Sequence, residues 1–255
     1  MLKSVRHTAI LEAVAAKGSC SVAELARDLR VSGETIRRDI KAMADDGLVR
    51  KVHGGVRVAE PLRESDFHQR LIANAEAKKA IARRAAREVR NGDSLVLDTG
   101  STTAYVAQAL RDHRDLLVVT NSVDIARSLA TRNGNRVYMA GGELRADDGA
   151  ALGPSATTFV RQFRVRLALL SIGAIDAENG LMDYHLSEAE FSRVVMERAE
   201  RTIVVADRSK FGRRALVRVA GFDDVDTLIT DVEPPAPYGQ LLRQAGARVM
   251  VGGEG

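Results

Sequence analysis

The chain of 255 residues is 45% hydrophobic and 28% charged, which suits a globular protein with one small and one larger domain. Its longest apolar run, near residues 167–172, is too short to span a bilayer, and no signal-peptide pattern opens the chain. The single cysteine, Cys20, excludes an intramolecular disulfide, and five scattered histidines form no metal-ligand pattern, so we expect no metal site.

The formal net charge of +4 is concentrated at one end of the chain. Residues 1–58 hold 11 Lys and Arg against 7 Asp and Glu, whereas the remainder holds 27 of each sign. A solvated basic surface would explain this excess. If the cations lie on a helix or hairpin that can contact DNA, the excess positive charge instead favours nucleic acid as the partner.

The first sixty residues show three short helical segments and a hairpin. Ser21 and Glu24 form a capping box, and two adjacent arginines, Arg37 and Arg38, follow a tight turn, as in a helix-turn-helix. Residues 48–56 alternate and end in Gly-Gly, which predicts a cationic β-hairpin, or wing. The helices are expected over residues 5–16, 22–29 and 34–46.

This segment resembles the DeoR-type winged helix of bacterial transcriptional repressors. The resemblance rests on Thr35-Ile36-Arg37-Arg38-Asp39 and on Arg50-Lys51-Val52-His53-Gly54-Gly55, at the family's usual spacing. It implies that residues 1–58 bind double-stranded operator DNA, and therefore that the protein is cytoplasmic. The candidate DNA-binding residues are Ser32, Glu34, Thr35, Arg37, Arg38, Lys41, Arg50, Lys51 and His53.

Residues 59–75 are polar, contain Pro61 and lack a sustained period, which indicates a linker. The following domain, residues 76–255, alternates short β-rich runs with helical stretches, which predicts a mostly parallel α/β sheet. Strands are expected over 94–98, 116–120, 136–139, 167–172, 202–206, 227–230 and 248–251. Helices are expected over 78–89, 102–110, 123–132, 156–162, 188–201 and 238–245.

Polar and glycine-containing turns follow several of these strands, where open α/β sheets bind ligands. The Gly-Ser-Thr-Thr turn of residues 100–103 opens a helix, so its free N–H groups and hydroxyls can cradle a phosphate. Ordinary helix capping explains the same residues equally well when each turn is taken alone. Their convergence on one edge favours a site. The candidate effector-binding residues are Asp98, Thr99, Gly100, Ser101, Thr102, Thr103, Asn121, Ser122, Gly141, Gly142, Gly173, Asp207 and Lys210.

This half resembles the DeoR-type sensor domain through residues 98–103, 119–122, 140–142, 206–212 and 229–231. That domain is similar to ribose-5-phosphate isomerase, and the resemblance implies a phosphorylated sugar or related metabolite as the effector. The expected fold class is α/β, with an N-terminal winged helix-turn-helix domain followed by a mostly parallel α/β sensor domain.

An isomerase would need a carboxylate base and an electrophile for the carbonyl oxygen, and Asp98 and Lys210 offer such groups. However, the isomerase's lysine and glycine-run motif is absent after Gly173, and a capping box over residues 187–190 explains Glu188 more simply. We therefore expect a ligand-responsive repressor that forms a homo-oligomer, with no catalytic residue, no cofactor and no membrane partner. Two alternatives stay open: a sugar-phosphate isomerase fused to a DNA-binding head, and a constitutive DNA-binding protein whose α/β half only oligomerises.

Overall fold

The computed structural model describes residues 6–7, 9–10, 13–14, 17–45, 49–52, 54–58 and 64–253. The chain divides into two compact units, residues 1–62 and residues 63–255. Each unit has its own hydrophobic core. After the functions expected from the sequence, we name residues 1–62 the DNA-binding unit and residues 63–255 the sensor unit.

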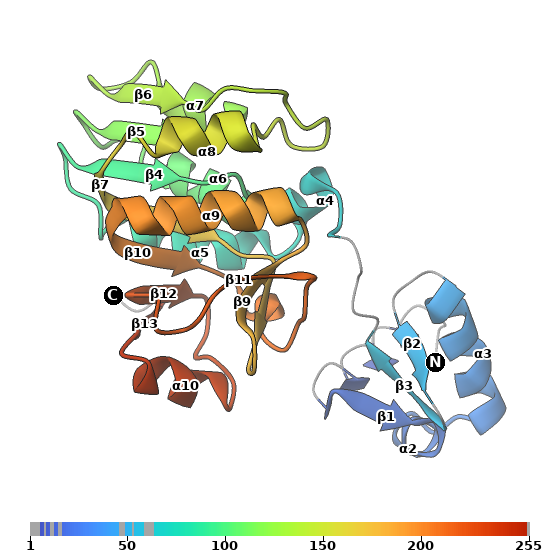
Figure 1. Ribbon diagram of the computed structural model, residues 1–255. Coiled ribbons are helices and arrows are strands. Elements are labelled where there is room, and N and C mark those ends of the chain that lie inside the picture. The colour runs from blue at the N-terminus through green and yellow to red at the C-terminus, as the bar shows by residue number, and fades with distance from the viewer. Residues whose placement is uncertain are drawn as a thin grey trace. The chain divides into compact units, whose positions relative to one another are not determined.

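The DNA-binding unit is a winged helix, as the sequence predicts (Figure 1). Its described elements are the strand β1 (Ser19–Ser21), the helices α2 (Val22–Asp28) and α3 (Gly33–Asp45), and the strands β2 (Val49–Val52) and β3 (Gly55–Val58). The described residues of the predicted first helix are helical. β2 and β3 pair as an antiparallel hairpin, and β1 pairs with β3.

The predicted capping box of α2 is confirmed. Ser21 Oγ accepts from the backbone N–H of Glu24 at 3.1 Å, and the Glu24 carboxylate accepts from the N–H of Ser21 at 2.8 Å. The helices and the hairpin close over buried Ile10, Leu25 and Ile36. The core therefore holds α3 and the wing together in one small unit.

The sensor unit is built on a seven-stranded sheet in which all neighbouring strands are parallel. The strands are β4 (Ser94–Leu97), β5 (Leu117–Thr120), β6 (Arg136–Met139), β7 (Val165–Ser171), β10 (Ala199–Val205), β12 (Thr227–Thr230) and β13 (Arg248–Val251). Their order is β13-β12-β10-β7-β4-β5-β6. The chain adds strands on one side of β4 and then on the other, so the topological switch point lies between β4 and β7.

Helices cover both faces of this sheet (Figure 1). On one face lie α5 (Ala75–Ala86), α6 (Ser101–Ala109) and α7 (Val123–Leu129), and on the other α8 (Pro154–Val160), α9 (Leu186–Arg198) and α10 (Tyr238–Gln244). Alternate strand residues enter the two cores: Leu95 and Leu97 face α5 and α6, whereas Val96 faces α8 and α9. Both faces are buried, which explains the continuous apolar runs of the strands.

A small antiparallel sheet in the sensor unit was not predicted. It contains β8 (Ala174–Asp176), β9 (Gly180–Asp183) and β11 (Val217–Ala220), in the order β11-β9-β8. Every residue of β8 and β9 is buried, so these strands lack the alternation that marks a half-exposed strand.

The prediction of a linker over residues 59–75 is wrong for its second part. Residues from Glu64 onward belong to the sensor unit, and Phe67–Ile72 form helix α4. The Asp147 carboxylate, 80 positions away, accepts from the N–H of Phe67 at 3.1 Å, and the Phe67 side chain is buried. This contact is long-range, and therefore leaves no local pattern in the sequence. No helix among the described residues is long and apolar enough to cross a membrane.

Candidate effector site and DNA-binding surface

Five of the candidate DNA-binding residues border one groove between α3 and the wing: Glu34, Arg37, Arg38, Lys41 and Lys51. Arg37, Arg38 and Lys41 lie exposed on α3, and Lys51 lies exposed on β2. The groove lies between them and is lined by Val22, Glu34, Arg37, Arg38, Ile40, Lys41, Lys51, Val52, Gly54 and Gly55. Arg50 is exposed on the same hairpin, whereas His53 lies outside the described residues.

The start of α3 is held by local hydrogen bonds. Ser32 Oγ accepts from the N–H of Thr35 at 3.1 Å and lies 2.8 Å from Thr35 Oγ1. Glu34 pairs with Arg37 at 3.3 Å on the exposed surface. Ser32, Glu34 and Thr35 therefore have a structural role at the helix start, and the roles of all these residues on DNA stay predictions.

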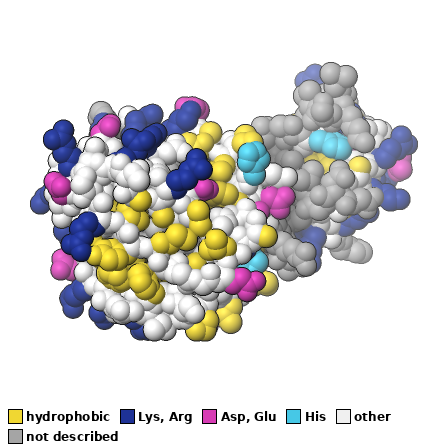
Figure 2. Space-filling model, turned by 90° about the horizontal axis from the view of Figure 1, so that it is seen from above, with side chains coloured by type: hydrophobic (Ala, Val, Ile, Leu, Met, Phe, Trp, Pro, Cys, Tyr) yellow, Lys and Arg dark blue, Asp and Glu magenta, His cyan; other side chains and the backbone are white. Residues whose placement is uncertain are grey.

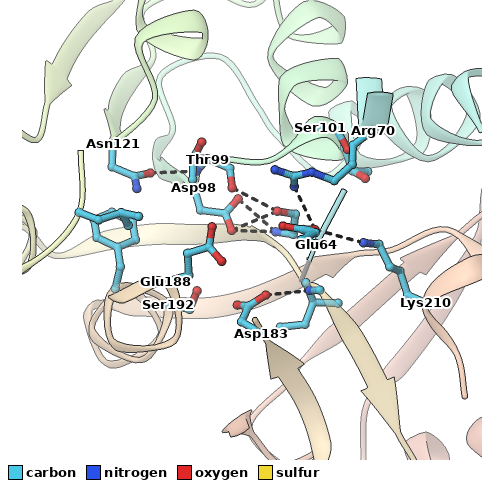
Figure 3. A pocket seen from close by; sticks show the side chains of 16 residues that line it. Glu64, Arg70, Asp98, Thr99, Ser101, Asn121, Asp183, Glu188, Ser192 and Lys210 are labelled. Atoms are coloured by element: carbon cyan, nitrogen blue, oxygen red, sulfur yellow. Dashed lines mark hydrogen bonds and ion pairs between the residues drawn. The ribbon is translucent and has the colours of Figure 1, made fainter. Parts of the chain in front are cut away.

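A second, polar pocket lies in the sensor unit at the topological switch point, beyond the ends of β4 and β7 (Figure 3). This is where doubly wound sheets bind their ligands. It is lined by Glu64, Arg70, Asp98, Thr99, Ser101, Thr102, Asn121, Leu152, Ser171, Ile172, Gly173, Asp183, Glu188, Phe191, Ser192 and Lys210. We call it the switch-point pocket.

Asp98 lies at the centre of this pocket and is held by the neighbouring strand. Both of its carboxylate oxygens accept from the backbone N–H of Ser171, at 3.1 and 3.0 Å. Burial raises the pKa of Asp98 well above its usual value, and the hydrogen bond from Ser171 opposes this shift. A buried carboxyl with such a pKa can either donate to or accept from a hydroxyl.

Asn121 connects the ends of β4 and β5. Its Oδ1 accepts from the N–H of Thr99 at 2.8 Å, and its Nδ2 donates to the carbonyl of Ala151 at 3.2 Å. The amide therefore holds together the turn before α6 and the loop before α8.

Two further acids, Asp183 and Glu188, line the other side of the pocket. Asp183 accepts from the N–H of Gly173 at 2.8 Å, and burial, with the nearby Glu188 and Glu64, raises its pKa well above the usual value. Burial likewise raises the pKa of Glu188, although Arg145 pairs with it at 2.6 Å. This side of the pocket offers acceptors for hydroxyl groups.

The cations of the pocket are Arg70 on α4 and Lys210, whose side chains are each 14% exposed. Burial lowers the pKa of Lys210, and the Glu64 carboxylate opposes this shift. Lys78 holds the backbone at Arg70, because its buried Nζ donates to the carbonyl of Arg70 and, at 2.7 Å, to that of Ala73.

Several residues expected to bind the effector do not line the pocket. Thr103 Oγ1 donates to the carbonyls of Asp98 and Gly100, at 2.9 and 3.1 Å, and so closes the turn. Ser122 caps α7 by accepting from the N–H of Ile125, and Asp207 accepts from Asn74 and from the N–H of Ser209. The residues outside the lining are Gly100, Thr103, Ser122, Gly141, Gly142 and Asp207.

Gly100 nevertheless supports the pocket, because β7 approaches it closely. A Cβ atom built on Gly100 would lie 2.0 Å from Ser171 Oγ, so only glycine fits beside this strand.

The sequence prediction missed Glu64, Arg70, Asp183 and Glu188. The predicted capping box over residues 187–190 is wrong, since α9 begins at Leu186 after an N-cap at His185. Glu188 instead lies in the first turn of α9 and points into the pocket (Figure 3). Arg70 and Glu64 lay in the supposed linker, so nothing in the sequence marked them.

A winged helix with exposed cations, joined to an α/β unit with a polar pocket at its switch point, defines a ligand-responsive DNA-binding protein. The DeoR-like helix-turn-helix domain matches residues 6–61, and the DeoR C-terminal sensor domain matches residues 73–232. The chain belongs to the DeoR family of transcriptional regulators.

Two curated relatives carry the same name. The glycerol-3-phosphate regulon repressor of Escherichia coli (strain K12) is 36% identical over 95% of this chain and 96% of its own length. That of Haemophilus influenzae (strain ATCC 51907 / DSM 11121 / KW20 / Rd) is 37% identical over 100% of this chain and 99% of its own. Both are named as repressors, and the two family models together match most of this chain, so the chain is a transcriptional regulator and the fused-isomerase alternative is set aside.

Among solved structures, ribose 5-phosphate isomerase from Plasmodium falciparum is 17% identical to this chain. The match covers 53% of this chain and 52% of that one, with a TM-score of 0.39. This likeness is too slight to bear on activity.

Proposed function

We propose that this regulator is a cytoplasmic repressor of carbohydrate-metabolism genes that a small phosphorylated polyol or sugar releases from operator DNA. The effector binds in the switch-point pocket, and its binding favours a state of the protein that fits the operator poorly. One observation carries the proposal: two largely buried cations and several polar side chains, among them Asp98 and Asn121, line the same pocket.

The two kinds of group match the two ends of such an effector. Arg70 and Lys210 bind the phosphate, assisted by the free N–H groups and hydroxyls at the start of α6, at Ser101 and Thr102. Asp98 and Asn121 bind hydroxyl groups. Glycerol 3-phosphate is the first compound to test, because the relatives named above are repressors of a glycerol-3-phosphate regulon.

A thermal-shift experiment on the full chain tests this assignment, because a ligand of the folded state raises the melting temperature. Glycerol 3-phosphate, ribose 5-phosphate and fructose 6-phosphate are compared with glycerol, ribose and fructose. We expect a rise with at least one phosphate ester and none with its unphosphorylated partner. Lys210→Met should abolish the rise, whereas the exposed Lys79→Met should not.

Operator release is the second part of the test. The compound that raises the melting temperature should weaken operator binding at the same concentrations. The opposite result has two parts: no compound changes the melting temperature, and no compound changes operator affinity. That result would instead support a constitutive DNA-binding protein.

We further propose that the sensor unit assembles the chain into a homo-oligomer, a dimer or a tetramer. Dimeric winged-helix and helix-turn-helix proteins read paired half-sites on DNA. Figure 2 shows one face of the sensor unit on which hydrophobic side chains gather between Lys and Arg side chains. Light scattering coupled to size-exclusion chromatography should give a mass of two or four chains, and a mass of one chain would contradict the proposal.

A further inference from the structure

One carboxylate in the switch-point pocket comes from outside its strand ends. Glu64 Oε1 lies 3.0 Å from Arg70 Nη1 and 3.7 Å from Lys210 Nζ, between the two cations (Figure 3). The Glu64 side chain is itself 14% exposed. The structure therefore shows an anion held by both of the cations that line the pocket.

Arg70 can bind more than this carboxylate. Its Nε is buried, and no described residue accepts a hydrogen bond from it. Its Nη2 lies 3.8 Å from Asp147, beyond hydrogen-bond distance. A phosphate has three acceptor oxygens and up to two negative charges, so it can use the guanidinium fork more fully than one carboxylate oxygen does.

Glu64 shares the pocket with other acids. Asp183 and Glu188 line it as well, and burial, with smaller contributions from nearby carboxylates such as Glu64, raises the pKa of both. The lining thus holds more acids than cations. A phosphate in the place of Glu64 would offer Arg70 and Lys210 more charge and more acceptor oxygens than one carboxylate does.

Glu64 is also close in the chain to the DNA-binding unit. Only residues 59–63 separate it from Val58, the last residue of the wing strand β3. No helix or strand includes residues 64–66, and α4 begins at Phe67. Glu64 therefore lies near the wing in sequence, outside any helix or strand.

We propose that Glu64 is an internal competitor for the effector's phosphate: its carboxylate occupies Arg70 and Lys210 in the effector-free protein, and a phosphate monoester expels it. The proposal rests on the effector site assigned above. It adds that effector binding releases Glu64, which precedes α4 in the chain and follows the wing strand β3 by six residues.

The test compares full-length Glu64→Gln with wild type, using glycerol 3-phosphate, ribose 5-phosphate and inorganic phosphate as probes. Glutamine keeps the size of the side chain and removes its charge. We expect the dissociation constant of the bound probe to fall about tenfold, as when a competitor occupies about nine tenths of the sites. Glu200→Gln is the matched control, because it removes the same charge at the amino end of β10, away from the pocket.

Each outcome has a defined meaning. If wild type binds a probe and Glu64→Gln binds it with the same or a lower affinity, Glu64 is not a competitor. The effector site itself is not contradicted by that result. If neither wild type nor Glu64→Gln binds any of the phosphate compounds, both the competitor role of Glu64 and the proposed effector site are wrong. Circular dichroism of the ligand-free variant checks that it is folded.

A second measurement needs no variant. A glutamate-specific protease cleaves after Glu64 only when this residue leaves the pocket. We expect saturating phosphate ester to accelerate cleavage there while it slows cleavage elsewhere in the sensor unit. Protection of Glu64 by the ester would overturn the proposal even if Glu64→Gln failed to fold.

Discussion

At the scale of single residues, the same polar side chain can cap a helix or line a site, and only its surroundings decide. Ser122 and Thr103 satisfy backbone groups of their own turns, whereas Ser101 and Thr102 line the pocket. Glu188 shows the converse, since it fits a capping pattern in the sequence and lines the pocket in the structure.

The roles of the threonines and serine at the start of α6 can therefore be separated. Ser101→Ala combined with Thr102→Ala should weaken effector binding about tenfold or more, because it removes hydroxyl donors to a charged group. Thr103→Ala should leave effector affinity unchanged and lower the free energy of unfolding by about 1 kcal/mol, since its hydroxyl closes the turn. Calorimetric titration and denaturant unfolding measure the two effects, and a reversed pattern would move the phosphate site elsewhere.

Lys78 should make stability depend on pH in an identifiable way. Burial lowers its pKa from 10.5 to about 8, so between these pH values the unfolded chain binds more protons than the folded chain. The free energy of unfolding should therefore rise with pH across this window, by up to ~3 kcal/mol at ~1.4 kcal/mol per pKa unit. Lys78→Met should lack this rise, and exposed Lys79→Met should keep it. Urea unfolding from pH 7 to 10 measures the free energy of unfolding of each protein. The same dependence on pH in wild type and Lys78→Met would contradict the lowered pKa of Lys78.

At the scale of elements, the switch-point pocket depends on how closely the turn between β4 and α6 approaches β7. Gly100→Ala places a methyl group against Ser171 Oγ, and we expect a loss of roughly 1–3 kcal/mol in the free energy of unfolding together with weaker effector binding. Gly100→Ala combined with Ser171→Gly should recover part of the stability, because the clashing atoms are gone. Additive losses in the double variant would show that the two residues do not meet.

The recognition helix α3 presents its arginines to solvent beside the wing. Arg38→Ala should weaken operator binding by ~1–3 kcal/mol and relax specificity at one base pair, if Arg38 reads a base edge. Arg83→Ala removes the same charge from the exposed surface of α5 and should not affect binding. Gel-shift titrations at matched salt make the comparison, and equal affinities for both variants would exclude Arg38 from the interface.

At the scale of the whole molecule, the chain is two units with separate cores joined by a short segment. We expect residues 64–255 alone to unfold in one cooperative transition at the melting temperature of the sensor unit in the full chain. The DNA-binding unit should give a separate, smaller transition in the full chain. Differential scanning calorimetry tests this, and a single shared transition would show that the two units unfold together.

The sequence by itself determined the class of this protein and most of its elements. The winged helix, the capping box of α2, the hairpin and the seven parallel strands follow from local signals: helical spacing, a cap, a Gly-Gly turn and apolar runs. Each of these signals involves residues only a few positions apart, so it can be recognised in the sequence without knowledge of the fold. For the same reason the strand ends, and with them Asp98 and Asn121, could be located in advance.

Only the tertiary structure decided which of these residues share a pocket and what else enters it. Arg70 and Glu64 come from a segment whose helix begins at a contact with Asp147, and Asp183 comes from a buried strand without alternation. Their positions depend on pairing across many residues of the chain, which local propensity does not encode. Lys210 and the turn at residues 100–103 were therefore expected from the sequence, whereas the pairing of Arg70 with Glu64 in the same pocket became visible only when the chain was folded.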